Sequence, residues 1–433
     1  MSLNFNTFTI GGEQGGGGTP INNQDITVTE NGEYQAEEGY TGLGTVTVNT
    51  PVVNNQDLSV TQNGEYTADE GYSGLGTVTV NVPTGGGGLG TGEFCVKVYD
   101  YDGTLLKVQY LNSGETFDLP EAPTHTGLTF QEWSSTKPIV NNQITVVDRD
   151  VLVGAIYDTS SGMTEIDIEA PASTAIYCYM NGTKDWGDGT TDTNTSHTYS
   201  TGGLYTIKCN GSTFTSSINY NNNLIGSNSN AVMQYVLRAV RFSSNVSAIP
   251  YCIFLNCKDL KYVSIPKGVT SLGGFSFQYC YMVSCVILPS TLTSITDMTA
   301  FMDCRALEVF ISSAITSVPQ NMFKNCTSLS DVILPDTVTS IGANAFDTCY
   351  SMSGRKSIFP NALTSIGASA FANTYNIENY DFSRSTTIPT LENKNAFYLR
   401  TFSQINVPAD LYSTWITSGN WANINSFYFI VKS

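Results

Sequence analysis

The sequence predicts a mainly β, multidomain protein that ends in a long solenoid. Phenylalanine recurs at spacings of 22 to 26 residues between Phe254 and Phe397, which is typical of a coiled array. Two near-identical 30-residue segments and several glycine-rich runs precede that array. Hydrophobic residues make up 41% of the 433 residues, enough to build packed cores. We therefore expect about three or more folded units joined by linkers.

Charge is distributed unevenly along the chain. The net charge is −18, yet residues 1–200 hold 26 acidic and 5 basic residues, whereas residues 201–433 hold 11 acidic and 14 basic residues. An acidic chain is a poor partner for nucleic acid or for an anionic membrane, because both require lysine and arginine patches. The start of the chain has no signal-peptide pattern and no run has the length of a membrane span. We expect no nucleic acid partner and no membrane insertion.

The N-terminal part predicts a stalk. Residues 22–51 and 54–83 are copies with 23 of 30 positions identical, and each contains an alternating run followed by Asn-Gly. Asn-Gly is typical of hairpin turns, so residues 22–83 are expected to form two tandem β-hairpin repeats. Each copy is too short for a core of its own and must stack, oligomerise or dock on a partner. Residues 1–21 and 84–92 are rich in glycine and predict linkers, the first of them with an attachment segment.

Residues 93–160 predict a small β module. Strand-like runs at Phe94–Tyr99 and Leu105–Tyr110 flank an Asp-Gly turn, and the last strand is expected at Asp150–Tyr157. The spaced elements of this segment are Gly114-Glu115-Thr116, Pro120, Pro123, Gly127-Leu128-Thr129-Phe130 and Trp133. They resemble the Listeria–Bacteroides repeat, which implies a β-grasp-like surface module with no chemistry of its own.

Residues 161–215 predict a sandwich. Its motifs are Asp185-Trp186-Gly187-Asp188-Gly189-Thr190, His197-Thr198-Tyr199 and Gly203-Leu204-Tyr205-Thr206-Ile207. They resemble the PKD domain, which implies an immunoglobulin-like fold, although one aromatic residue is missing between Trp186 and Gly187. The acidic residues are expected to cap turn N–H groups rather than to bind a cation. Cys178 and Cys209 are expected to be thiols on facing strands.

The array predicts a solenoid over residues 216–404, with a cap at 405–433. Five coils place a cysteine three residues after the phenylalanine: Phe254 and Cys257, Phe277 and Cys280, Phe301 and Cys304, Phe323 and Cys326, and Phe346 and Cys349. The recurring pattern L-x-x-V-x-I/L-P, V-T-S-I-G and A-F-x-x-C resembles the BspA-like, Treponema-type leucine-rich repeat. A short helix around Ala409–Thr417 is expected to cover the last coil.

The 10 cysteines are better explained by packing than by a disulfide framework or a metal site. Five of them recur at one position of the coil, which predicts a buried ladder. The chain has no C-x-x-C and only 2 histidines, His125 and His197, both outside the array, so zinc would lack ligands. Cys285 lies outside the ladder and is expected to be exposed. We predict no metal and no cofactor.

The solenoid strands also predict an open face. Residues that alternate with the buried ones should point to solvent, where they could contact a protein or a glycan or form an ordinary sheet face. They are Arg238, Arg241, Lys261, Tyr262, Ser264, Ile287, Val309, Ile311, Asp331, Ile333, Arg355, Lys356, Asn379 and Asp381.

Catalysis is not expected. A nucleophilic triad would have to use His125 or His197, and the sequence contains no nucleophile elbow, HExxH, Walker or dinucleotide-binding motif. The chain has no catalytic residue that we can name. Acidic residues are plentiful, but they are scarce in the array and lie mostly in predicted turns elsewhere.

The modules together predict recognition. The repeat V-T-E-N-G-x-Y with G-L-G-T-V-T-V-N resembles short repeats in virion proteins of phages that infect gut bacteria. This resemblance implies a fibre-like virion protein, assembled in the host cytoplasm, that binds other virion proteins through its N-terminal segment and a bacterial surface protein or glycan through the solenoid. A homo-oligomer, with three copies by analogy, is expected. The alternatives are a BspA-like adhesin on the bacterial surface and a tail-associated polysaccharide depolymerase.

Overall fold

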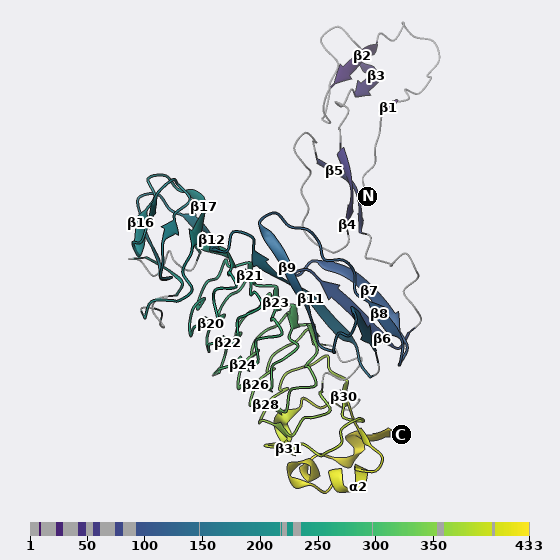
Figure 1. The fold of residues 1–433 in the computed structure, drawn as a ribbon. Helices are drawn as coiled ribbons and strands as arrows, with labels where there is room; N and C mark the ends of the chain where they lie inside the picture. The colour runs from purple at the N-terminus through teal and green to yellow at the C-terminus, as the bar shows by residue number, and fades with distance from the viewer. Residues whose placement is uncertain are drawn as a thin grey trace, which may run out of the picture. The chain divides into compact units, whose positions relative to one another are not determined.

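The computed structural model describes residues 8–9, 23–28, 42–48, 55–60, 74–80, 92–146, 148–216, 218, 223–227, 235–296, 298–352, 359–400 and 403–432. These residues fall into two compact units, Met1–Val82 and Pro83–Ser433 (Figure 1). The attachment segment, both glycine-rich linkers and the Asn-Gly dipeptides of the repeats lie almost entirely outside the described residues. Among the described residues, no helix has the length and apolar character needed to cross a membrane.

The N-terminal unit corrects the hairpin prediction. Its strands are β1 (Phe8–Thr9), β2 (Asn23–Val28), β3 (Gly42–Val48), β4 (Asn55–Val60) and β5 (Gly74–Val80). Within each repeat the two strands pair in parallel, β2 with β3 and β4 with β5, whereas a hairpin requires antiparallel pairing. Parallel strands need a long crossover connection instead of a two-residue turn. The local Asn-Gly signal therefore does not set the pairing of these strands.

Residues 92–160 form a four-stranded mixed sheet in the order β7-β6-β11-β9, with β10 and β8 as a separate pair. The strands are β6 (Phe94–Tyr99), β7 (Leu105–Leu111), β8 (Thr116–Asp118), β9 (Leu128–Ser135), β10 (Gln143–Thr145) and β11 (Val151–Thr159). The predicted hairpin is confirmed, because β6 and β7 are antiparallel across the turn at Gly103. The central pair, β6 and β11, is parallel. We call residues 92–160 the β module.

Residues 164–227 contribute seven strands in two sheets. They are β12 (Thr164–Ala170), β13 (Ala175–Cys178), β14 (Lys184–Asp185), β15 (Thr191–Asp192), β16 (Ser196–Thr198), β17 (Gly203–Cys209) and β18 (Ile225–Ser227). Strand β12 pairs with β17 on one side and with β19 of the solenoid on the other. The sheet therefore runs without interruption across the predicted boundary between sandwich and solenoid at residues 215 and 216.

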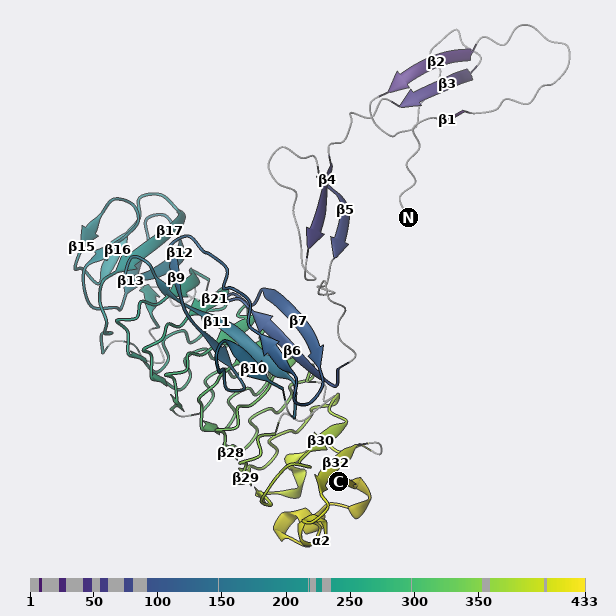
Figure 2. The same ribbon diagram turned by 45° about the vertical axis from the view of Figure 1, so that its right-hand side comes forward.

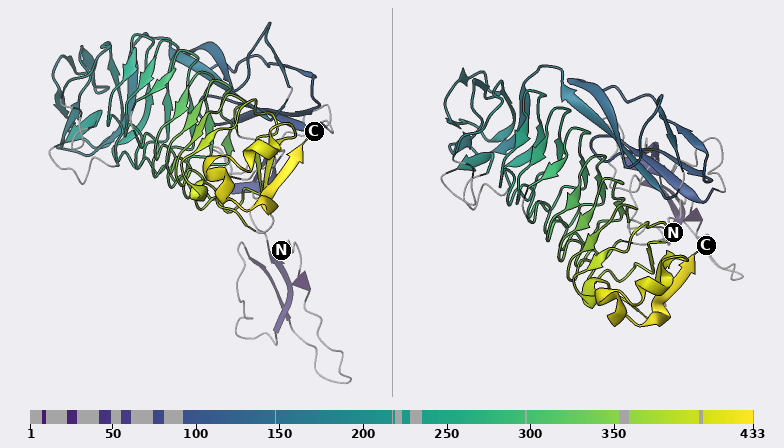
Figure 3. Two further views of the ribbon diagram at one scale, coloured as in Figure 1. Left: turned by 90° about the horizontal axis from the view of Figure 1, so that it is seen from below. Right: turned by 60° about the horizontal axis from the view of Figure 1, so that its bottom comes forward.

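Each coil of the solenoid supplies a strand to one or both of two parallel series, which Figure 3 shows stacked along the axis. The first series is β19 (Leu237–Arg241), β21 (Tyr262–Ser264), β23 (Cys285–Ile287), β25 (Val309–Ile311), β27 (Asp331–Val332) and β30 (Asn379–Asp381). The second is β20 (Ala248–Ile249), β22 (Ser271–Leu272), β24 (Ser294–Ile295), β26 (Ser317–Val318), β28 (Ser340–Ile341), β29 (Ser365–Ile366) and β31 (Thr390–Leu391). One hydrophobic core extends from the sandwich to the last coil.

The phenylalanine and cysteine ladder is confirmed. All ten ladder side chains are buried, and the Phe323 ring stacks 5.2 Å from that of Phe346. The thiols of Cys280, Cys304, Cys326 and Cys349 each also donate a hydrogen bond to the phenylalanine carbonyl of the preceding coil, as Cys326 does to Phe301 at 3.0 Å. The residue before each ladder cysteine has a φ between 60° at Asp303 and 69° at Thr348. This left-handed conformation favours asparagine and turns the chain in every coil.

Buried thiols should be inert in the native protein. All 10 cysteines are buried and unbonded, including Cys285, so its predicted exposure is wrong. Burial raises the pKa of both Cys95 and Cys252 to about 11. At pH 8 these groups are protonated, and the thiolate is the reactive form. We expect a disulfide reagent such as DTNB to label no thiol of the native protein within minutes and all ten in denaturant; rapid labelling of a native thiol would contradict this packing.

The C-terminal residues close the solenoid, as the sequence predicted. The elements are η1 (Lys394–Ala396), β32 (Gln404–Pro408), α2 (Tyr412–Trp415), η2 (Gly419–Asn423), η3 (Ser426–Tyr428) and β33 (Phe429–Lys432). Helix α2 lies inside the predicted segment but is only 4 residues long. Trp415 and Trp421 are buried against Phe382, and the Trp421 indole donates to the Pro389 carbonyl at 2.7 Å. Indole burial thus protects the last coil from solvent.

Candidate functional site

The β module covers the middle of the predicted open face. Strand β11 contacts β21, β23 and β25 of the first series, and Figure 2 shows the module in front of the solenoid strands. Ile287, Val309 and Ile311 are between 0% and 6% exposed and pack against Tyr99, Leu152 and Ile156 of the module. Ile333 packs at the edge of this cluster. Ser264 is also buried, and its hydroxyl donates to the Tyr157 carbonyl. The predicted exposure of these strand residues is therefore wrong.

Strand β11 can join the two parts because it is buried on both sides. Val151 and Val153 pack in the module core, whereas Leu152 and Ile156 face the solenoid. Between these two lies Gly154, where an added Cβ would lie 2.6 Å from the Ile287 side chain. The apolar run at residues 151–153 and the runs in β23 and β25 are typical of strands buried on both faces. That signal was present in the sequence and could have predicted the covered face.

Ion pairs surround this apolar contact. Asp331, expected to be open, accepts from Lys97 at 2.7 Å and from the Tyr99 hydroxyl. Asp336 binds Lys137 at 2.8 Å and also Arg149, which is 2% exposed. Burial by itself would raise the pKa of Asp336, but the Lys137 hydrogen bond and the Arg149 charge outweigh it and hold the pKa below its usual value.

The Asp336 ion pairs predict acid sensitivity of the contact. A carboxyl group with a lowered folded pKa stabilises the protein above its unfolded pKa, about 4, and this stabilisation is lost as pH falls through the folded value. We expect Asp336→Asn to lower the melting temperature at pH 7 by a few degrees and to flatten the loss of stability below about pH 4. Asp410→Asn, at an exposed cap residue, is the control. Parallel melting curves for wild type and D336N across pH 2–7 would refute the role of these pairs.

The start of the solenoid remains open and forms a groove. It has a volume of about 690 Å³ and lies on the face shared by β17, β12, β19 and β21. Four predicted site residues meet there: Arg238, Arg241, Lys261 and Tyr262. The sandwich supplies the other side of the groove, with Asp167 and Glu169 at its floor and Leu204 and Tyr205 at its wall. Leu204 is 76% exposed, which is unusual for a leucine in a strand.

A dense ionic network forms the floor of the groove. Arg241 donates two hydrogen bonds to Asp167, at 2.7 and 2.8 Å, and a third to the Tyr262 hydroxyl at 2.7 Å. Arg238 pairs with both Glu169 and Asp259. These bidentate and multiple contacts fix the guanidinium planes. The walls therefore offer an exposed leucine, a tyrosine and the exposed Lys261 above a rigid polar floor.

Sequence reasoning missed the sandwich side of the groove. Asp167 and Glu169 alternate with buried residues in β12, so an exposed strand face was predictable, but its partner was not. The pairing of β12 with β19 joins segments about 70 residues apart, and no local signal encodes it. The other predicted face residues lie elsewhere. Asn379 and Asp381 are half-buried in β30, and Arg355 and Lys356 are outside the described residues.

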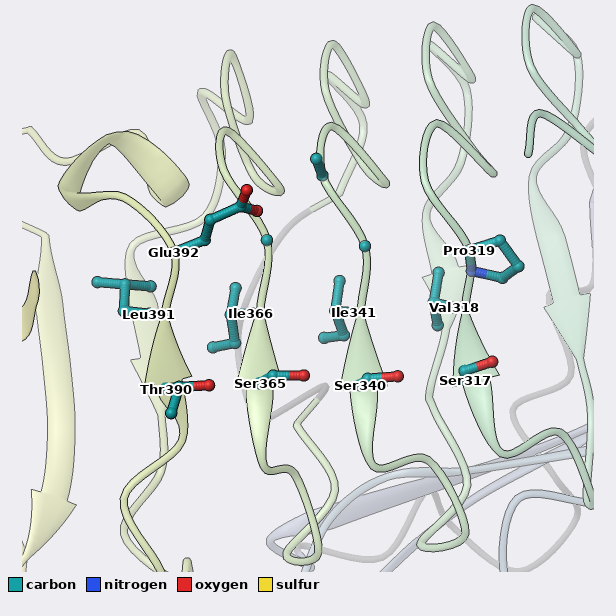
Figure 4. Close-up of a pocket in the computed structure, with 13 residues that line it drawn as sticks. Ser317, Val318, Pro319, Ser340, Ile341, Ser365, Ile366, Thr390, Leu391 and Glu392 are labelled. Carbon is teal, nitrogen blue, oxygen red and sulfur yellow. The ribbon is translucent and has the colours of Figure 1, made fainter. Parts of the chain in front are cut away.

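A second groove, of about 590 Å³, follows the second series of strands. Figure 4 shows Ser317, Ser340, Ser365 and Thr390 at one position of four neighbouring strands, each followed by an apolar residue such as Ile341. Glu392 lies at its C-terminal end and accepts from the Ala368 amide at 2.8 Å. Its lining alternates hydroxyl and aliphatic side chains, with Glu392 as the one charged residue among the described residues that line it.

The acidic turns act as caps. Asp185, Asp188 and Asp192 accept backbone N–H groups of Gly187, Thr190 and Asn194 at 2.9 to 3.0 Å, as the sequence analysis expected. Asp102 accepts from the Thr104 amide in the same way. Each histidine pairs with one aspartate, His125 with Asp100 and His197 with Asp188, both at 2.7 Å. The described part of the chain contains no cluster of three or more metal-ligating side chains.

Comparison with known proteins identifies the array. Residues 208–308 and 297–425, together about half of the chain, match the BspA type leucine-rich repeat region in 6 copies. The chain belongs to the BspA-type leucine-rich repeat family. Among curated proteins, none matches it. The PKD-like and Listeria–Bacteroides-like assignments of residues 93–215 stay predictions.

Solved leucine-rich repeat proteins are similar over part of the chain. One from Bacteroides ovatus is 23% identical over 40% of this chain and 49% of its own, with a TM-score of 0.32. One from Eubacterium ventriosum is 24% identical over 35% of this chain and 40% of its own, with a TM-score of 0.29. The T. pallidum protein is 21% identical over 31% of this chain and 62% of its own, with a TM-score of 0.28. This BspA-type chain thus spans less than two thirds of each.

Proposed function

We propose that this BspA-type protein is a non-enzymatic recognition protein that binds a bacterial surface protein or glycan. The observation that carries the proposal is the groove at the start of the solenoid, where Leu204 and Lys261 are exposed above a fixed ionic floor. Exposed apolar side chains gathered with polar groups are typical of interaction sites. The face that the solenoid would otherwise offer is used internally by the β module.

The recognition function is tested by binding of the labelled full-length chain to intact cells of a panel of gut bacteria. Leu204→Glu combined with Lys261→Glu changes the groove walls without touching the ionic floor, and it should lower cell binding at least tenfold. Phe427→Glu, at a residue 69% exposed in the cap, is the matched control. If the wild type binds no cells in the panel, or if the groove variant binds like the wild type, this function is excluded for the groove.

We further propose that the protein is a phage virion component, attached through its N-terminal segment and present as a homo-oligomer. The phage-like repeats of residues 22–83 support this proposal. Immunogold electron microscopy of purified particles tests it, with labelling of a head or tail structure as the expected result. Labelling of bacterial cell walls in phage-free cultures would instead support a BspA-like adhesin, which the family membership favours equally. Release of reducing sugar from host glycans would support a depolymerase.

A further inference from the structure

A row of tyrosines and cations runs along one corner of the solenoid, between the ladder turns and the first series of strands. It consists of one residue from each of seven consecutive coils. In the five coils that have a ladder cysteine, this residue directly follows that cysteine, and in the other two it occupies the equivalent position. The residues are Tyr235, Lys258, Tyr281, Arg305, Thr327, Tyr350 and Tyr375. We call this set the tyrosine–cation ridge. It is separate from the groove and from the face covered by the β module.

Ring contacts join neighbouring coils in two parts of the ridge, on either side of Thr327. The Lys258 ammonium lies 5.6 Å from the ring centroids of both Tyr235 and Tyr281, and the Arg305 guanidinium lies 5.1 Å from that of Tyr281. Further along, Tyr350 and Tyr375 stack at 5.3 Å with an interplanar angle of 15°.

The ridge is exposed. Tyr235 is 49% and Tyr350 40% exposed, and the neighbouring Met282 is 51% exposed. Few large apolar side chains in the described chain reach such exposure, and three of them lie at separate points on or beside the ridge. In the part of the chain that the structure describes, no carboxylate pairs with Lys258, and the nearest acid to Arg305 is Asp303 at 3.5 Å. Lys258 therefore carries a charge without a carboxylate partner in the described chain, whereas Arg305 shares its charge with Asp303.

Spacing decides which anion fits. Neighbouring coils lie about 5 Å apart, the separation of hydrogen-bonded strands, which is close to the length of one sugar residue. Lys258 and Arg305 are two coils apart with Tyr281 between them. A chain with one anionic group on every second sugar would place its charges at both cations. The sugar between them would then lie against Tyr281.

We propose that the tyrosine–cation ridge binds an anionic polysaccharide that lies along the solenoid axis and carries one anionic group in each disaccharide. This inference rests on the recognition function proposed above and names a second surface with its ligand class. Attraction between the cations and the anionic groups contributes binding affinity, which salt weakens by screening the charges. The spacing of the coils determines which sugar lies against which coil.

The test uses the full-length chain and a fluorescent hyaluronan decasaccharide, which has one carboxylate per disaccharide, beside the same sugar with its carboxylates reduced to alcohols. Fluorescence polarisation should show at least tenfold weaker binding of the reduced sugar. Lys258→Gln combined with Arg305→Gln should weaken binding of the acid sugar at least tenfold, and Tyr281→Leu should weaken it severalfold. Lys394→Gln, an exposed cation outside the ridge, should leave it within twofold. Equal binding of both sugars, no binding of either, or normal binding by the double variant would overturn the proposal.

Cell binding separates this proposal from the proposed function. Recognition stands and the ridge proposal fails if the groove variant loses cell binding while K258Q/R305Q retains both cell binding and normal affinity for the acid sugar. If the wild type binds the acid sugar through the ridge but binds no cells, the ridge proposal stands and the recognition function fails. Loss of cell binding after protease treatment of the cells, with no affinity for the acid sugar, would assign a protein ligand and overturn the ridge proposal.

Discussion

Replacing Gly154 by valine is expected to separate the β module from the solenoid. A Cβ at this position would lie 2.6 to 2.9 Å from three side-chain atoms of Ile287, closer than van der Waals contact allows. Ile287 is itself held by Val309 and Ile311 in the same buried cluster, so it has little room to move. Overpacking of this kind costs about 1–3 kcal/mol, and valine should cost the upper end of that range.

Hydrogen exchange and urea unfolding measure the effect of G154V. The amides of β23 and β25 should lose protection in the variant, and the free energy of unfolding should fall by about 3 kcal/mol. Gly203→Ala is the matched control, because this strand glycine has only the Tyr205 ring within 4 Å, at 3.8 Å. It should leave stability within about 0.5 kcal/mol of the wild type. Unchanged protection in G154V would mean that the module does not pack on these strands.

Truncating Phe323 to alanine is expected to have the largest effect on the solenoid itself. The ring is fully buried, stacks between those of Phe301 and Phe346 at 5.7 and 5.2 Å, and contacts that of Phe310 at 4.8 Å. Loss of a buried phenylalanine removes its transfer free energy and leaves a cavity, at a cost of about 3–5 kcal/mol. Because each coil packs only on its neighbours, the damage should begin at the middle coils.

Chemical denaturation followed by tryptophan fluorescence distinguishes local from global loss in F323A. Trp415 and Trp421 lie in the cap, so with Trp133 and Trp186 replaced by phenylalanine the fluorescence reports the C-terminal coils. In F323A we expect a lower denaturation midpoint. We also expect the cap tryptophans to show the first transition, because the coils on the two sides of the cavity no longer unfold together. Phe427→Ala removes a ring that is 69% exposed. It should change the free energy of unfolding by less than about 0.5 kcal/mol. Equal effects of the two substitutions would exclude a continuous stacked core.

The strongest sequence predictions concern residues that pack within a coil or on the next coil. The spacing of Phe254, Phe277 and Phe301 places each ring on its neighbour, and their rings lie 4.9 and 5.0 Å apart. The hairpin at Gly103 also followed from its local turn residues. The same turn reasoning was wrong for residues 22–83, where the strands of each repeat pair in parallel through a longer connection.

Alternation along a strand predicts which side chains leave the core, but not whether water or another sheet meets them. Ile311 occupies the outward position that the sequence assigned to it and is nevertheless 0% exposed, because Leu152 and Ile156 cover that face. Arg241 and Tyr262 occupy equivalent positions in the first coils and line the open groove. Strand β11 of the β module contacts β25, which carries Ile311.

The sequence by itself determined that the chain coils, which side chains form the ladder and which family it belongs to. A side chain that is buried once in every coil recurs at a regular spacing in the sequence. The tertiary structure alone decided which segment covers each face of the solenoid and where the open groove lies. The contact of Gly154 with Ile287 and the pairing of Asp167 with Arg241 join residues remote in the chain. Such contacts depend on complementary shape and charge between separately formed sheets, for which no local residue pattern is required.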